Sequence, residues 1–160
     1  AGAQPMHHTA RKLVVTYNGE IYNFRELREQ LEHFGHRFAT NCDTEVLLAA
    51  YAQWGTAAVE RFNGIFAFAL WDGAAQRLWL ARDRLGVKPL YYWVSPEGCL
   101  AFASEIKQFS VLPGWSAQLN PQRAYDFLNW SLIDHTRETL FDHVFQLRNG
   151  EALELRYGDR

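Results

Sequence analysis

The sequence has 160 residues and a formal net charge of -2, and 48% of its residues are hydrophobic and 15% aromatic. This composition excludes a disordered chain and is typical of a globular domain with a real core. The charge gives no support to nucleic-acid binding, and no apolar run approaches the roughly 18 residues of a membrane span. Two cysteines do not make a disulfide framework, so a cytoplasmic location is predicted.

The first half of the sequence predicts one strand followed by helices. A run rich in Val, Thr and Tyr is typical of a strand, and apolar residues at helical spacing follow it. Asn23 is expected to cap the first helix. The expected elements are a strand at 12–17, a helix at 23–34, a short strand at 37–38, a helix from 43 or 44 to 55 and a short helix at 57–61.

The second half alternates between apolar and polar residues, as antiparallel strands do. Two hairpins are predicted, 64–72 with 75–83 and 89–95 with 99–104. The remaining expected elements are a helical turn at 105–109, a loop at 110–120, a helix at 121–132 and a strand at 151–157. Because helices come before a run of consecutive strands, the fold class is α+β, with helices layered on antiparallel sheets.

The stretch Asn18-Gly19-Glu20 lies where the first strand is expected to stop. Asn-Gly is a common turn signal in hairpins, yet the next segment is a helix and not a returning strand. A turn at a strand end can instead direct a side-chain amide and a backbone N–H at one point, which is the geometry of an oxyanion hole. The residues alone leave both interpretations open.

Two carboxylates also have two interpretations each. Asp43 is either the N-cap of the second helix or an anchor for a substrate ammonium group. Glu20 is either a solvated turn carboxylate or a second anchor for the same cation.

Structural roles are predicted for the cysteines and for Arg82 and Asp83, and no metal-binding role is predicted for the histidines. Cys42 and Cys99 are expected to be buried, inert thiols. The histidines show no metal-ligand spacing, so no metal site is predicted. Arg82 and Asp83 stand at a strand end before a Gly-containing loop, and they predict a structural ion pair that locks this loop.

Four runs occur in an order and spacing that resemble a known family. They are NGEIYNFRELREQL, CDTEVLLAAYAQWG, RFNGIFAFALWD and LARDRLGVKPLYY. Together they are similar to the glutaminase domain of glutamine-hydrolysing asparagine synthetases, a class II glutamine amidotransferase domain. By this resemblance, residues 1–110 are a partial amidotransferase domain, and residues 111–160 are its C-terminal part and a connector toward a synthetase domain.

The resemblance implies a fold and a site. The fold is an αββα sandwich of antiparallel sheets between helix layers, of the N-terminal nucleophile hydrolase type and here incomplete. The Asn18 side chain and the Gly19 N–H would form the oxyanion hole. Glu20 and Asp43 would hold the α-amino group of glutamine.

The sequence departs from the family pattern at its start. The family attacks glutamine with an N-terminal cysteine whose own amine acts as base, and it binds the substrate carboxylate with the Arg of an RGPD run. Neither occurs here, since residue 1 is Ala. The chain alone is therefore expected to be inactive. Because the first sheet would lack strands, either dimerisation or swapped strand pairing is expected to cover its exposed edge.

The resemblance implies that the complete protein hydrolyses glutamine to glutamate and ammonia, which then amidates aspartate. No cofactor is expected in this domain, and ATP and Mg²⁺ would belong to a synthetase domain. One alternative is a synthetase-like enzyme with another acceptor, since the family's LPPG run is replaced by LRNG at 147–150. Another alternative is a non-catalytic, amino-acid-binding scaffold.

Overall fold

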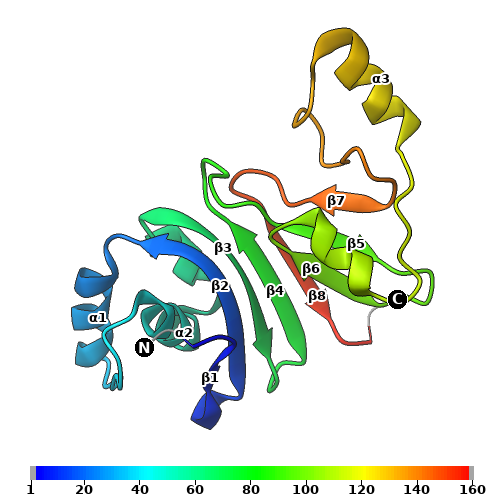
Figure 1. Ribbon diagram of the computed structural model, residues 1–160. Coiled ribbons are helices and arrows are strands. Elements are labelled where there is room, and N and C mark those ends of the chain that lie inside the picture. The colour runs from blue at the N-terminus through cyan, green and yellow to red at the C-terminus, as the bar shows by residue number, and fades with distance from the viewer. Residues whose placement is uncertain (1–2, 159–160) are drawn as a thin grey trace.

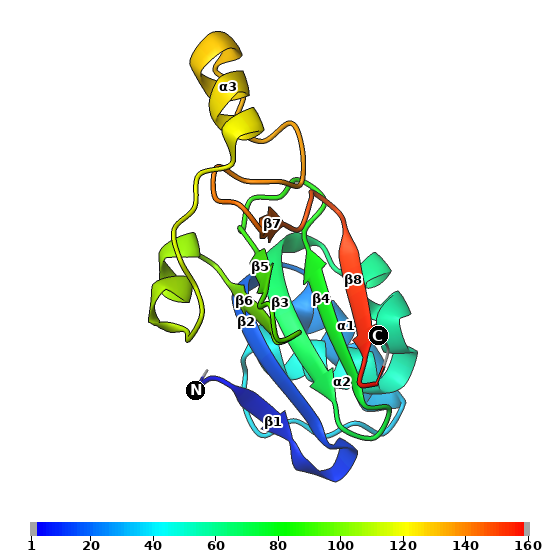
Figure 2. The same cartoon turned by 90° about the vertical axis from the view of Figure 1, so that its right-hand side faces the viewer.

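Two antiparallel sheets lie against each other, and helices cover the outer side of the larger one (Figures 1 and 2). The structure is a computed structural model and describes residues 3–158. Sheet A has the strand order β1-β2-β3-β4-β8, and sheet B the order β6-β5-β7. Sheet A consists of β1 (Met6–His8), β2 (Leu13–Ile21), β3 (Gly64–Asp72), β4 (Arg77–Arg82) and β8 (Ala152–Arg156). Sheet B consists of β5 (Tyr91–Val94), β6 (Leu100–Ala103) and β7 (Val144–Gln146).

The helical segments differ in what they cover. Helices α1 and α2 lie on one face of sheet A, and η3 packs on sheet B, where Phe109 lies 6.5 Å from Trp93 between ring centroids. No helix within residues 3–158 is both long and apolar enough to cross a membrane. The segments are η1 (Thr9–Arg11), α1 (Phe24–His33), α2 (Asp43–Trp54), η2 (Gly55–Arg61), η3 (Ile106–Val111) and α3 (Pro121–Trp130).

Strand β3 shows how one strand serves two packing layers. Phe66, Phe68 and Leu70 are buried in the cluster formed with α1 and α2. Ala67 and Ala69 alternate with them and belong to the cluster between the two sheets. This division follows from the two-residue side-chain period of a strand.

The α+β class, the antiparallel sheets and both hairpins are confirmed. The expected strand at 151–157 is β8, which pairs with β4. The last expected helix ends at Trp130, two residues early, because Ser131 adopts a left-handed conformation with φ 55°. Strands β1 and β7 were not predicted, since each has only three residues and such short strands show no clear alternation.

Two local predictions near the first helices are wrong. The segment around residues 37–38 is not a strand, and the Phe38 ring instead lies 4.7 Å from the Arg28 guanidinium. Asn23 occupies the N-cap position of α1, but its side chain makes no cap hydrogen bond. Its amide accepts from the Asn63 N–H at 2.9 Å and donates to the Arg61 carbonyl at 2.9 Å, which fixes the start of α1 to the segment before β3.

The predicted ion pair between Arg82 and Asp83 is also wrong, because each side chain binds backbone instead. The Arg82 guanidinium donates to three carbonyl oxygens at 2.7–2.8 Å. The Asp83 carboxylate is 1% exposed and accepts four backbone N–H bonds. Both side chains therefore stabilise the loop after β4, as predicted, but by separate contacts.

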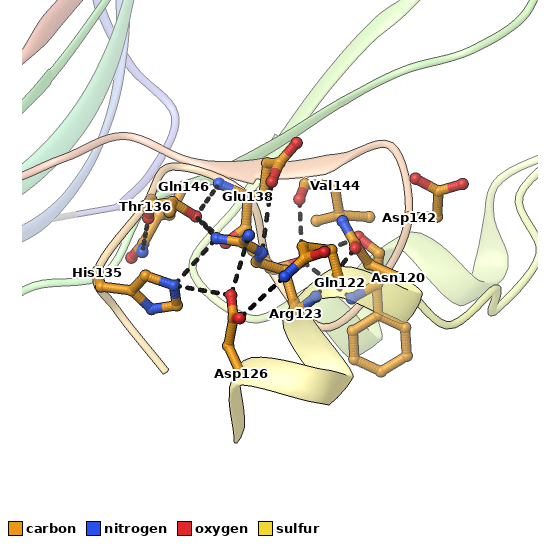
Figure 3. A network of polar contacts seen from close by, with 12 residues as sticks. Asn120, Gln122, Arg123, Asp126, His135, Thr136, Glu138, Asp142, Val144 and Gln146 are labelled. Carbon is orange, nitrogen blue, oxygen red and sulfur yellow. Dashed lines mark hydrogen bonds and ion pairs between the residues drawn. The ribbon is translucent and has the colours of Figure 1, made fainter. Parts of the chain in front are cut away.

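Helix α3 stands away from both sheets (Figures 1 and 2). None of its residues is buried. A polar network joins it to the segment that follows, as Figure 3 shows. Arg123 lies 2.9 Å from the Asp126 carboxylate, which also lies 3.0 Å from the His135 imidazole. Polar contacts thus hold α3 at its base in place of an apolar core.

Candidate functional site

The stretch Asn18-Gly19-Glu20 lies inside β2 and is not a turn. Strand β2 continues to Ile21 and pairs with β3 along its whole length, with Gly19 opposite Phe66. The sequence-based prediction of a strand end at this point is therefore wrong. The polar residues interrupt the apolar pattern of the strand but not its pairing.

Gly19 is required by the close approach of β2 and β3. A Cβ atom at this position would lie 2.2 Å from the Ile65 carbonyl oxygen and 2.6 Å from the Phe66 Cα. The φ angle of Gly19 is +155°. No other residue type fits here without displacing backbone.

We expect Gly19→Ala to lower the free energy of unfolding by about 1–3 kcal/mol, because the added methyl group meets backbone that cannot give way. Gly35→Ala is the matched control, since Gly35 has φ +88° but a Cβ added there would meet no atom within 4 Å. Urea denaturation of both variants measures the difference. Equal losses would show that the collision at Gly19 is relieved without cost.

Within residues 3–158, β1 pairs with β2 only at Leu13–Val15, so the edge of β2 that faces away from β3 is free from Thr16 to Ile21. Side chains occupy part of the hydrogen-bond donors along this free edge. The Tyr17 N–H donates to Gln4 Oε1 at 2.6 Å, and the Ile21 N–H donates to Asp43 Oδ2 at 3.0 Å. Alternate residues of a strand direct their N–H groups to the same edge, so the Gly19 N–H points there too, between these two amides. Gln4 and Asp43 thus flank an amide that faces this edge.

The side chain of Asn18, which directly precedes Gly19, is exposed. Its Nδ2 lies 3.4 Å from the Ser104 hydroxyl, just after β6. Asn18 and Ser104 line a cavity of about 330 Å³ between the two sheets, together with Gln4 and Phe102. The structure therefore places an amide donor beside a cavity, with the Gly19 N–H on the adjacent residue.

Asp43 is the first residue of α2, and Cys42 is the N-cap, so the prediction of an Asp43 cap is wrong. Asp43 Oδ2 accepts from the Tyr17 hydroxyl at 2.6 Å as well as from the Ile21 N–H. Its other oxygen, Oδ1, forms no hydrogen bond within residues 3–158. The carboxylate is thus fixed against β2 with one oxygen available.

Tyr17 connects Asp43 with Glu20. Burial raises the pKa of the Tyr17 hydroxyl, and the hydrogen bond to Asp43 and the charges of Asp43 and Glu20 raise this pKa further. Tyr17 therefore stays protonated and keeps donating to Asp43. The negative charges of Asp43 and Glu20 both act on this hydroxyl, so this part of the strand edge favours a cation.

Neither cysteine lines the cavity at Asn18. The Cys42 thiol is half-buried and lies 2.9 Å from the Thr40 hydroxyl. Cys99 is exposed, so the prediction that it is buried is wrong. It immediately precedes β6, in the turn of the second hairpin.

Three residues of the site were missed from the sequence: Gln4, Tyr17 and Ser104. Tyr17 resembles any other residue of an apolar strand, although its place directly before Asn18 is a signal. Gln4 and Ser104 are distant from Asn18 in the sequence, and only the pairing of the sheets brings them to it.

Comparisons with known proteins show which family this chain resembles. A glutamine amidotransferase domain model matches residues 1–160. Asparagine synthetase [glutamine-hydrolyzing] 3 of Bacillus subtilis is 45% identical over 121 residues, which are 74% of this chain and 20% of that protein. A putative asparagine synthetase [glutamine-hydrolyzing] of Mycobacterium tuberculosis is 47% identical over 149 residues, 91% of this chain and 22% of that protein. The chain thus spans about a fifth of the length of these relatives.

A solved structure supports the fold independently. The glutamine phosphoribosylpyrophosphate amidotransferase from B. subtilis, complexed with ADP and GMP, has a TM-score of 0.59. The match covers 98% of this chain and 32% of that chain, at 20% identity. At this identity the likeness shows the fold alone.

Proposed function

Because this chain belongs to the glutamine amidotransferase domain family, we propose that it binds glutamine at the free edge of β2 and supports its hydrolysis to glutamate and ammonia. The observation that supports this proposal most directly is that three polar groups follow each other along β2. An amide side chain, an edge-facing backbone N–H and a carboxylate follow each other from Asn18 to Glu20, and Asp43 is fixed beside them.

The proposed reaction begins with a thiolate that attacks the side-chain amide carbon of glutamine. The carbonyl oxygen gains negative charge, and the Asn18 Nδ2 and the Gly19 N–H donate to it. Ammonia leaves, and water releases glutamate from the thioester. Neither Cys42 nor Cys99 lies at the cavity, so we assign the attack to an N-terminal cysteine, as the resemblance implies.

Glu20 and Asp43 are proposed to bind the α-ammonium group of glutamine. The Tyr17 hydroxyl and the Ile21 N–H both donate to Asp43 Oδ2, which leaves Oδ1 for the substrate. Because Tyr17 remains protonated, its hydroxyl keeps donating to Oδ2 and holds the carboxylate in this orientation. The two ends of glutamine would thus be recognised at one strand edge.

The use of the ammonia is a further proposal. The names of the relatives indicate an asparagine synthetase, in which a second catalytic domain would amidate aspartate with ATP and Mg²⁺. Another carboxylate acceptor is the alternative. We also propose that the protein forms a homodimer in the cytoplasm.

Asp43→Asn in the native polypeptide that carries this domain is expected to raise KM for glutamine about tenfold or more, because loss of a charge-assisted hydrogen bond costs about 1.5–3 kcal/mol. The value of kcat should change little, since the ammonium is bound equally in the ground state and the transition state. Steady-state release of glutamate measures both constants.

Asp134→Asn is the control, because Asp134 is exposed and lies on the segment after α3. An unchanged KM in Asp43→Asn would remove Asp43 from the substrate site. A loss of kcat at unchanged KM would contradict its role as an anchor.

A further inference from the structure

A second cavity lies between β1, the loop after α1, and α2, on the helix-covered side of sheet A. Its volume is about 430 Å³. Among the described residues, none lines both this cavity and the cavity at Asn18. Its basic lining residues are His7, His8, Arg11, His36 and Arg37.

The basic residues form walls and a rim. On β1, His8 points to the same side as Met6, which packs against the core under α1 and α2, so the His8 side chain faces the cavity. His7 also lines the cavity but is exposed. His8 and His36 are half-buried and form walls, whereas Arg11 and Arg37 are exposed at the rim. Different segments thus bring cationic groups to one opening.

The two arginines are available to a ligand. Within residues 3–158, neither Arg11 nor Arg37 forms an ion pair or a side-chain hydrogen bond. Among the described residues, Glu45 is the one carboxylate that lines the cavity. It accepts from the Ala39 N–H at 2.8 Å and from the Thr40 N–H and hydroxyl at 2.7 and 2.6 Å. Its hydrogen bonds hold both oxygens in place, so they are not directed at the arginines of the rim, although the carboxylate keeps its negative charge.

The floor of the cavity is apolar. Leu48 and Ala49 of α2 line it and are buried, and Phe38 lies half-buried beside them. A volume of this size falls in the range of about 300–1,000 Å³ that is typical of small-molecule sites. An apolar floor with a cationic rim suits a small molecule that has both an anionic group and a less polar body.

We propose that this cavity binds a phosphate-bearing small molecule, with Arg11 and Arg37 contacting the phosphate. Arginine presents paired N–H donors that match phosphate oxygens, which favours phosphate over a halide or another spherical anion. Two observations argue against a nucleic acid as the ligand. The net charge of the chain is -2, and the basic groups line a pocket and do not form a stripe along the surface. This site is independent of the glutamine site.

Hydrogen–deuterium exchange of the native polypeptide, with millimolar pyrophosphate as the probe, tests the proposal. Pyrophosphate should slow exchange in peptides that cover residues 7–11 and 36–38. In the double variant Arg11→Gln/Arg37→Gln, half-maximal protection should need about tenfold more pyrophosphate, as expected when charge-assisted contacts are lost. Both arginines are exposed and unpaired among the described residues, so the fold should be retained.

Arg25→Gln/Arg156→Gln is the matched control, because it removes two exposed positive charges elsewhere. It should leave the protection of both segments unchanged. No protection of these segments in the unaltered protein, or protection that survives the Arg11→Gln/Arg37→Gln change, would overturn the proposal. Protection lost equally in the control would also overturn it, since binding would then follow overall charge.

Discussion

Asn18→Ala in the native polypeptide is expected to lower kcat for glutamine hydrolysis about 10²–10³-fold, the usual cost of removing one oxyanion-hole donor. The Asn18 side chain is exposed, and its hydrogen bond to Ser104 is long, at 3.4 Å. The free energy of unfolding should therefore stay within about 0.5 kcal/mol of the unaltered value. Glutamate release and urea denaturation measure the two effects.

Asn129→Ala is the control for this change, because Asn129 is an exposed asparagine on α3, away from both sheets. It should change neither rate nor stability. Asn18→Asp gives a second comparison, since it keeps the shape and replaces the donor with a negative charge; it should be at least as inactive as Asn18→Ala. Near-normal kcat in Asn18→Ala would remove this side chain from the oxyanion hole.

Asp83→Asn is expected to lower the free energy of unfolding by about 3–5 kcal/mol, because buried N–H groups lose their acceptor. Asp83 Oδ1 accepts from Leu85 and Val87, and Oδ2 from Phe66 and Lys88, at 3.0–3.2 Å. An asparagine can serve only one of these pairs, since its amide nitrogen cannot accept a hydrogen bond. Urea denaturation measures the loss, with Asp134→Asn as an exposed control.

The same carboxylate predicts a dependence of stability on pH. Burial acts to raise the pKa of Asp83, but the four backbone N–H donors outweigh burial and lower it below the ordinary value of 3.8. The stabilisation is therefore fully present above this value and is lost as the pH falls through the lower pKa of the folded state. Asp83→Asn should remove this part of the acid dependence. An unchanged acid profile would show that Asp83 does not contribute to it.

Much of the fold could be predicted because its local patterns are strong. The alternation in β3 and β4 and the helical spacing in α1 and α2 each indicate the right element. The extent of β2 could not be predicted, because Asn18 and Gly19 carry turn propensity and only pairing with β3 keeps them extended. Tertiary contacts decided the structure where local propensity pointed elsewhere.

The site was predictable in its residue types but not in its geometry. Cap preference favoured Asp43 as an N-cap, whereas the structure turns its carboxylate to Tyr17 and Ile21 across the fold. Likewise, Arg82 and Asp83 are neighbours of opposite charge, yet backbone groups outcompete their pairing. The contacts of Asp43 join residues distant in sequence, which spacing arguments do not detect. The contacts of Arg82 and Asp83 cited here are local, but they depend on the backbone conformation of the loop, which residue types alone do not give.

The proposed glutamine site is tested most directly by a crystal structure of the native polypeptide with the product glutamate bound. We expect a γ-carboxylate oxygen to accept hydrogen bonds from Asn18 Nδ2 and the Gly19 N–H, with the α-ammonium group against Glu20 and Asp43. Glutamate bound elsewhere, or bound here with its ammonium group away from both carboxylates, would contradict the proposed roles of these four residues.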